Sequence, residues 1–198
     1  MIADVVAKLI RLVCGASVRG ETDLPQQAVY FANHTSHLDA LVIWAALPKD
    51  IRSRTRPVAA RDYWGRFPWR RWLAEKVFNA ILIDRTRVTK ADNPVRHFVA
   101  AIKKGASLII FPEGSRNTED RIGPFKAGLF HLARAGRKIP LIPLHLGNLN
   151  RILPRGEFLP VPILSTITFG PALGLKSSES KHDFLARTRN SVISLQHS

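Results

Sequence analysis

A histidine and an aspartate five residues apart are the side chains best placed for acid–base chemistry. They are His34 and Asp39, in the segment N-H-T-S-H-L-D. In one continuous helix the two would point apart, because five residues correspond to about 140° of rotation. They meet only if His34 lies in a loop and Asp39 in the first turn of the next helix, and we predict that Ser36 is the N-cap of that helix. Asp39 would then bind one imidazole nitrogen and leave the other free to accept a proton from a hydroxyl.

Two other interpretations of this segment stay open. Ser36 and Asp39 also have the spacing of a capping box, in which the carboxylate only satisfies the helix N-terminus. Together with His37, the pair could also bind a metal, but the spacing departs from the H-x-H-x-D-H run of metallo-hydrolases. Ala40 stands where the final histidine of that run would be. We therefore predict no metal site and no cofactor.

Strand-like and helical patterns alternate along the chain. Short apolar runs predict strands, and apolar residues at helical spacing predict helices. The predicted strands are 28–32, 56–60, 80–83, 107–111, 139–146 and 163–169; the predicted helices are 2–13, one that follows Ser36, 93–104, 126–134 and 183–195. This alternation predicts an α/β fold, a single domain with a mixed, largely parallel sheet flanked by helices. Sites in such sheets form where strands end, and the polar clusters at 33–39, 84–85 and 112–117 follow predicted strands.

The N-terminal residues predict an amphipathic helix. Its apolar side comprises Ile2, Val5, Val6, Leu9, Leu12 and Val13, and its polar side Asp4, Lys8 and Arg11. Such a helix can lie in a bilayer interface or dock on the protein core, and the pattern favours neither. No apolar stretch reaches the ~18 residues of a spanning helix, and we expect no secretory signal. We divide the chain into a membrane-associating helix, 1–20, and the main domain, 21–198.

The charge is strongly unbalanced, with 30 Lys and Arg against 15 Asp and Glu and a formal net charge of +15. Such a field attracts nucleic acid, an anionic membrane or phosphorylated small molecules. Residues 49–76 interleave basic side chains with Tyr63, Trp64, Phe67, Trp69 and Trp72. That mixture suits an anionic bilayer interface or single-stranded nucleic acid. In a third interpretation the tryptophans belong to the core and the charges form a solvated face. The single cysteine, Cys14, excludes an internal disulfide.

A second motif, F-P-E-G-S-R-N at 111–117, also follows a predicted strand. Together with its companions it resembles the glycerolipid acyltransferase family, the lysophosphatidic acid acyltransferases and their relatives. The segments that carry the resemblance are N-H-x-S-x-x-D at 33–39, an apolar run closing in Asp84-Arg85, F-P-E-G-[TS]-R-[SN] at 111–117, F-K-x-G at 125–128, and an apolar run around Pro140 and Pro143. Their order and spacing agree over residues 28–146.

The resemblance implies O-acyl transfer from an acyl thioester to a hydroxyl of a lysophospholipid, in first place 1-acyl-glycerol-3-phosphate. His34 would be the general base and Asp39 its orienting partner. The acceptor's glycerol-phosphate end would be held by Arg85, Glu113, Gly114, Ser115, Arg116 and Lys126. Guanidinium groups and backbone donors suit a phosphate. We expect direct transfer without an acyl-enzyme, because Cys14 lies in the N-terminal helix and no G-x-S-x-G turn exists.

Several identities stay open at this point. The donor is acyl-CoA or an acyl carrier protein, and the acceptor is lysophosphatidic acid, glycerol 3-phosphate or another lyso-lipid. We expect a peripheral or monotopic protein at the cytoplasmic face of the membrane, with an anionic membrane surface as partner and no nucleic acid. The alternative is a basic nucleic-acid-binding module without catalysis, which explains the charge but neither motif.

Overall fold

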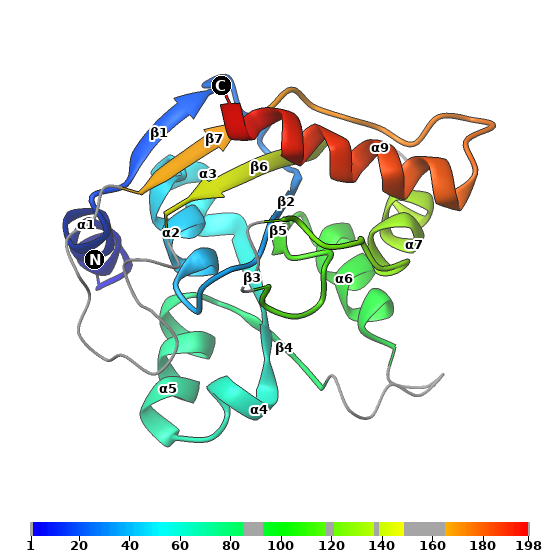
Figure 1. Ribbon diagram of the computed structural model, residues 1–198. Helices are drawn as coiled ribbons and strands as arrows, with labels where there is room; N and C mark the ends of the chain where they lie inside the picture. The colour runs from blue at the N-terminus through cyan, green and yellow to red at the C-terminus, as the bar shows by residue number, and fades with distance from the viewer. Residues whose placement is uncertain (1, 85–92, 118–120, 137–138, 149–164, 198) are drawn as a thin grey trace.

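The fold is built on one seven-stranded sheet (Figure 1). The computed structural model describes residues 2–84, 93–117, 121–136, 139–148 and 165–197. The strand order is β1-β7-β6-β2-β5-β3-β4. All neighbours are parallel except β6 and β7, which are antiparallel. The strands are β1 (Ser17–Gly20), β2 (Val29–Ala32), β3 (Thr55–Ala60), β4 (Ile81–Ile83), β5 (Ser107–Ile110), β6 (Leu141–Gly147) and β7 (Thr166–Phe169).

Helices cover both faces of the sheet, because the inner strands are apolar on both sides. Tyr30 and Ala32 of β2 face one core, while Val29 and Phe31 face the other. The first core is closed by α1 (Ile2–Cys14), α2 (Asp39–Ala46), α3 (Lys49–Arg54) and the π-helix η1 (Leu73–Val77). The second is closed by α6 (Pro94–Lys103), α7 (Gly128–Ala135) and α9 (Lys181–Ser194) (Figure 1). The short α4 (Arg61–Trp64) and α5 (Pro68–Trp72) follow β3, and η2 (Leu195–His197) is the last described element.

The predicted fold class is confirmed: a single α/β domain with a mostly parallel sheet flanked by helices. Every predicted strand and helix is present among the described residues, with its ends shifted by a few residues, and residues 163–164 of the last predicted strand lie outside the described ranges. The predicted N-cap is wrong, because α2 begins at Asp39 with Leu38 in the capping position. Ser36 instead forms the preceding turn, where its hydroxyl accepts a hydrogen bond from the Leu38 N–H at 3.3 Å.

Helix α1 presents three different sides. Its buried side packs Ala7 and Cys14 on the core. Its polar side is bonded to the neighbouring helices, since Arg11 donates to the carbonyls at the end of α2 and Asp4 pairs with Arg52 of α3 at 2.7 Å. Its third side is apolar and faces outward, formed by Ile2, Val5, Leu9, Leu12 and Val13. Helix α1 therefore docks on the core and still exposes a hydrophobic strip.

The N-terminal segment is continuous with the sheet, because β1 follows α1 closely and pairs with β7. Within the described ranges, no helix combines the length and apolarity needed to cross a bilayer.

Parallel pairing brings the ends of several strands to one edge. The carboxyl ends of β2, β5, β3 and β4 lie together there, so the segments that follow them converge. His34 follows β2, the 111–117 segment follows β5, and Tyr63 follows β3.

Candidate active site

His34 and Asp39 are in direct contact. The distance from His34 Nδ1 to Asp39 Oδ2 is 2.8 Å. The Asp39 side chain is fully buried, whereas the His34 side chain is 18% exposed. The same Oδ2 also accepts the backbone N–H groups of Thr35 at 2.6 Å and Ser36 at 2.9 Å. The carboxylate oxygen therefore contacts two backbone N–H groups and Nδ1 of the imidazole, and the contact with Nδ1 favours the tautomer that carries its proton there.

Ser36 and Asp39 do not form a capping box, because α2 begins at Asp39 and the Ser36 hydroxyl accepts the N–H of Leu38. The carboxylate of Asp39 does accept the Ser36 N–H, and this contact shapes the turn before α2. That turn is what lets the imidazole of His34 reach the carboxylate. In the part of the chain that the structure describes, no three His, Cys, Asp or Glu side chains converge as metal ligands would. The ring of His37 is stacked on Tyr63, with ring centres 3.8 Å apart.

Asn33 fixes the start of the loop that carries His34. Its buried side-chain amide donates to the carbonyl of Leu146 at 3.0 Å and accepts the N–H of the same residue at 2.8 Å. The side chain thus continues the pairing of β2 with β6 beyond the last residue of the strand. Sequence reasoning assigned no role to this contact, because it joins residues 113 positions apart.

The 111–117 segment braces His34 from three directions. The ring of Phe111 stacks on the imidazole, with centroids 4.2 Å apart and an interplanar angle of 17°. The His34 N–H donates to Glu113 Oε1 at 2.9 Å, and the His34 carbonyl accepts the N–H of Asn117 at 2.7 Å. The other carboxylate oxygen of Glu113 accepts the N–H of Gly123 at 2.9 Å. This second motif therefore holds the backbone and the ring of His34 in place.

Two cations of the predicted phosphate-binding set lie beside this brace. Arg116 is exposed and lines the same pocket as His34 and Gly114. The side chain of Lys126 lies against Gly114, where an added Cβ would come within 2.7 Å of Nζ. Gly114 has a φ of 74°, so glycine suits both its backbone and this close approach.

The remaining members of the predicted set differ in placement. Glu113 is buried and directs both carboxylate oxygens at backbone N–H groups. Ser115 is exposed and is not among the pocket-lining residues. Arg85 lies outside the described residues.

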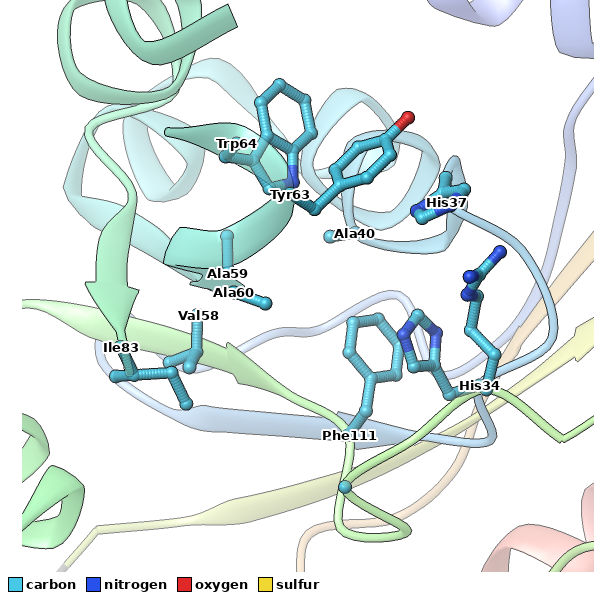
Figure 2. Close-up of a pocket in the computed structure, with 12 residues that line it drawn as sticks. His34, His37, Ala40, Val58, Ala59, Ala60, Tyr63, Trp64, Ile83 and Phe111 are labelled. Carbon is cyan, nitrogen blue, oxygen red and sulfur yellow. The ribbon is translucent and has the colours of Figure 1, made fainter. Parts of the chain in front are cut away.

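The pocket around His34 has two chemically different parts (Figure 2). One part is polar and contains the two histidines, Gly114 and Arg116. The other part is apolar and is formed by Val58, Ala59, Ala60, Trp64, Ile83 and Phe111. Figure 2 shows His34 beside Phe111, with Val58 and Ile83 along the apolar part. A ligand with an anionic head and an apolar portion suits such a pocket.

The fold and these motifs define the class of protein. The sequence profile of the Acyltransferase family matches residues 15–147, and the chain belongs to this family. The predicted family resemblance is thereby confirmed.

Two curated relatives carry the name of the same activity. The 1-acyl-sn-glycerol-3-phosphate acyltransferase of Limnanthes douglasii is 29% identical over 158 residues, which cover 79% of this chain and 53% of that protein. The corresponding alpha enzyme of Homo sapiens is 34% identical over 132 residues, which cover 64% of this chain and 44% of that protein. The chain thus spans about half the length of the curated relatives it matches.

A solved structure shares the fold. It is the 1-acyl-sn-glycerophosphate (LPA) acyltransferase PlsC from Thermotoga maritima, with a TM-score of 0.77 and 17% sequence identity. The similarity covers 99% of this chain and 78% of that chain.

Proposed function

We propose that this protein is an O-acyltransferase that moves a fatty acyl group from a thioester to the hydroxyl of 1-acyl-glycerol-3-phosphate. The observation that carries the proposal is the contact of 2.8 Å between His34 and Asp39, in a pocket with a cationic and an apolar part. Relatives named for this activity support the same choice. Binding of nucleic acid alone would leave the buried carboxylate and the braced imidazole without a role.

The thioester is already activated, but the attacking alcohol is not. The reaction therefore needs a base that takes the proton of the alcohol. In the proposed mechanism Nε2 of His34 takes the proton of the acceptor hydroxyl as its oxygen attacks the thioester carbonyl. Asp39 stabilises the resulting imidazolium. When the tetrahedral intermediate collapses, the carbon–sulfur bond breaks and the imidazolium returns the proton to the leaving thiolate. No acyl-enzyme is formed.

Arg116 and Lys126 are proposed to hold the acceptor's phosphate, with Arg85 as a further candidate. Gly114 allows close approach of Lys126 at this point. The apolar part of the pocket is proposed to hold the first carbons of an acyl chain.

We expect thioester consumption to depend on an acceptor that bears a phosphate monoester. The experiment offers acyl-CoA and an acylated carrier protein as donors, each with 1-acyl-glycerol-3-phosphate, glycerol 3-phosphate and lysophosphatidylcholine. The proposal expects the first acceptor to give the highest kcat/KM, because the cations match its charge. Absence of turnover with every pair, together with salt-sensitive binding to an oligonucleotide, would instead favour the nucleic-acid-binding module.

We further propose peripheral attachment to the cytoplasmic face of the membrane through α1 and α5. The outward side of α1 exposes large apolar side chains, with Leu12 79% exposed. Trp69 and Trp72 of α5 are also more than half exposed. Arg70 lies over the rings of Tyr63, Phe67 and Trp69 at 4.9 to 5.1 Å, so basic and aromatic groups are mixed. Such groups suit the headgroup region of an anionic leaflet.

Replacing Leu9 and Leu12 together by serine should weaken binding to phosphatidylglycerol vesicles about tenfold or more, because burial of one leucine contributes about 1.5–3 kcal/mol. Both side chains are exposed, so the thermal unfolding midpoint should change little. Vesicle co-sedimentation measures the change, with Arg134→Gln, an exposed residue of α7, as control. Equal binding by the double variant and the wild type would rule out α1 as the attachment site.

A further inference from the structure

A second hollow lies at the opposite edge of the sheet from His34. It has a volume of about 310 Å³ and is lined by Arg54, Arg56, Asn79, Ala101, Lys104, Gly105 and Ala106. Arg54 and Arg56 flank the start of β3, Gly105 and Ala106 precede β5, and Asn79 precedes β4. Because these strands are parallel, their starts lie at the edge away from the pocket of His34. The hollow is therefore separate from the candidate active site.

Arg56 is held in a fixed position in this hollow. Its Nε donates to the carbonyl of Asn79 at 2.8 Å. Asn79 has a φ of 50°, a left-handed conformation that is unfavourable for most residues other than glycine. Burial lowers the pKa of Arg56. In the described part of the chain, no carboxylate is paired with this guanidinium.

Two more cations line the hollow without a strong acidic partner. Arg54 and Lys104 are exposed, and within the described ranges neither forms an ion pair. Asp50 lies one turn before Arg54, but its carboxylate accepts a hydrogen bond from Gln26 at 3.2 Å. The pKa of Asp50 is lowered first by Gln26 and only last by the charge of Arg54. Within the described structure Asp50 and Arg54 do not form an ion pair.

The floor of the hollow is made of small residues. Ala101 and Ala106 contribute only methyl groups, and Gly105 has a φ of 84° with open space where a side chain would be. A volume of this size is at the lower end of the range for small-ligand sites, which is about 300–1,000 Å³. The hollow thus offers room next to three positive charges.

We propose that this hollow is a second anion site, which binds the phosphate group of a molecule other than the reacting acceptor. Two guanidinium groups and an ammonium match a phosphate, because its oxygens accept several charge-assisted hydrogen bonds at once. The phosphate belongs either to the headgroup of an anionic lipid or to a soluble phosphate compound. The proposal does not depend on the reaction at His34.

Amide NMR of the full chain during titration with inorganic phosphate tests the proposal at the site itself. The backbone signals of Gly105 and Ala106 should shift in the wild-type protein. In the double variant Arg54→Gln/Lys104→Gln the dissociation constant at these signals should rise about tenfold or more. Both replaced side chains are exposed and neither forms an ion pair within the described structure, so the fold should be preserved. Lys103→Gln, an exposed neighbour on α6 that does not line the hollow, is the matched control.

The proposal would be overturned if the signals of Gly105 and Ala106 did not move during the titration. It would also be overturned if the double variant gave the same shifts with the same dissociation constant as the wild type. Vesicles of phosphatidylglycerol then distinguish the two sources. Several-fold weaker vesicle binding by the double variant assigns the phosphate to a lipid headgroup. Unchanged vesicle binding, with phosphate binding lost, assigns it to a soluble compound.

Discussion

His34→Ala should lower kcat/KM for acyl transfer by about 10²–10⁴-fold, the range for loss of a positioned general base. The side chain is partly exposed in the pocket and makes its polar contact through Nδ1 with Asp39. The stacked Phe111 ring loses one neighbour, so stability should fall only slightly. Steady-state kinetics and thermal unfolding, measured on the same preparations, separate the two effects.

A matched control is His131→Ala, since His131 is an exposed residue of α7 outside the pocket. Adding Asp39→Ala to His34→Ala should lower activity little further, because groups that act as a unit show non-additive losses. Turnover above a tenth of the wild-type value in His34→Ala would eliminate the imidazole as the base.

Glu113→Ala should reduce both stability and turnover. The buried carboxylate accepts the N–H groups of His34 and Gly123, and the variant leaves both without that acceptor. The two N–H groups are only partly shielded, so we expect a loss of about 1–3 kcal/mol in the free energy of unfolding. Displacement of the base by about 1 Å can cost on the order of 100-fold in rate. Denaturant unfolding and kcat measured at saturating acceptor check both effects.

The changes in kcat and in KM show whether Glu113 positions His34 or binds the acceptor. If Glu113 only positions His34, the variant should have a lower kcat and a nearly unchanged KM. If Glu113 binds the acceptor, the variant should have a higher KM. Glu113→Gln should be intermediate, because one amide oxygen can still accept while the amide nitrogen faces an N–H donor. A raised KM for the acceptor with normal stability would favour the role predicted from the sequence, in which Glu113 helps to hold the acceptor.

The sequence predicted six of the seven described strands and the contact between His34 and Asp39, since both depend on local patterns. The apolar runs of β2 and β5 are continuous, as expected of strands buried on both faces. Strand β1 was missed because its four residues are exposed and lack an apolar run. The helices between Pro68 and Val77 were also missed, because each is too short to show helical periodicity.

The contacts of Glu113 and the N-cap could not be predicted from local pattern. Glu113 binds the N–H of a residue 79 positions away, and that pairing exists only once β2 and β5 lie side by side. Ser36 looks like an N-cap, but the Asp39 carboxylate takes the N–H groups of Thr35 and Ser36 and holds this stretch as a turn. The two alternatives for α1 were also indistinguishable, because the helix has separate sides for the core and for the surface.

Helix α2 connects the candidate active site with helix α1. Its first residue is Asp39, and the carbonyls at its other end are bonded to Arg11 of α1. Eight residues of helix form a rod about 12 Å long. Under the proposed attachment of α1 to a bilayer, α2 would link the attached helix directly to the carboxylate that contacts His34, and the length of α2 would limit how far that carboxylate lies from α1.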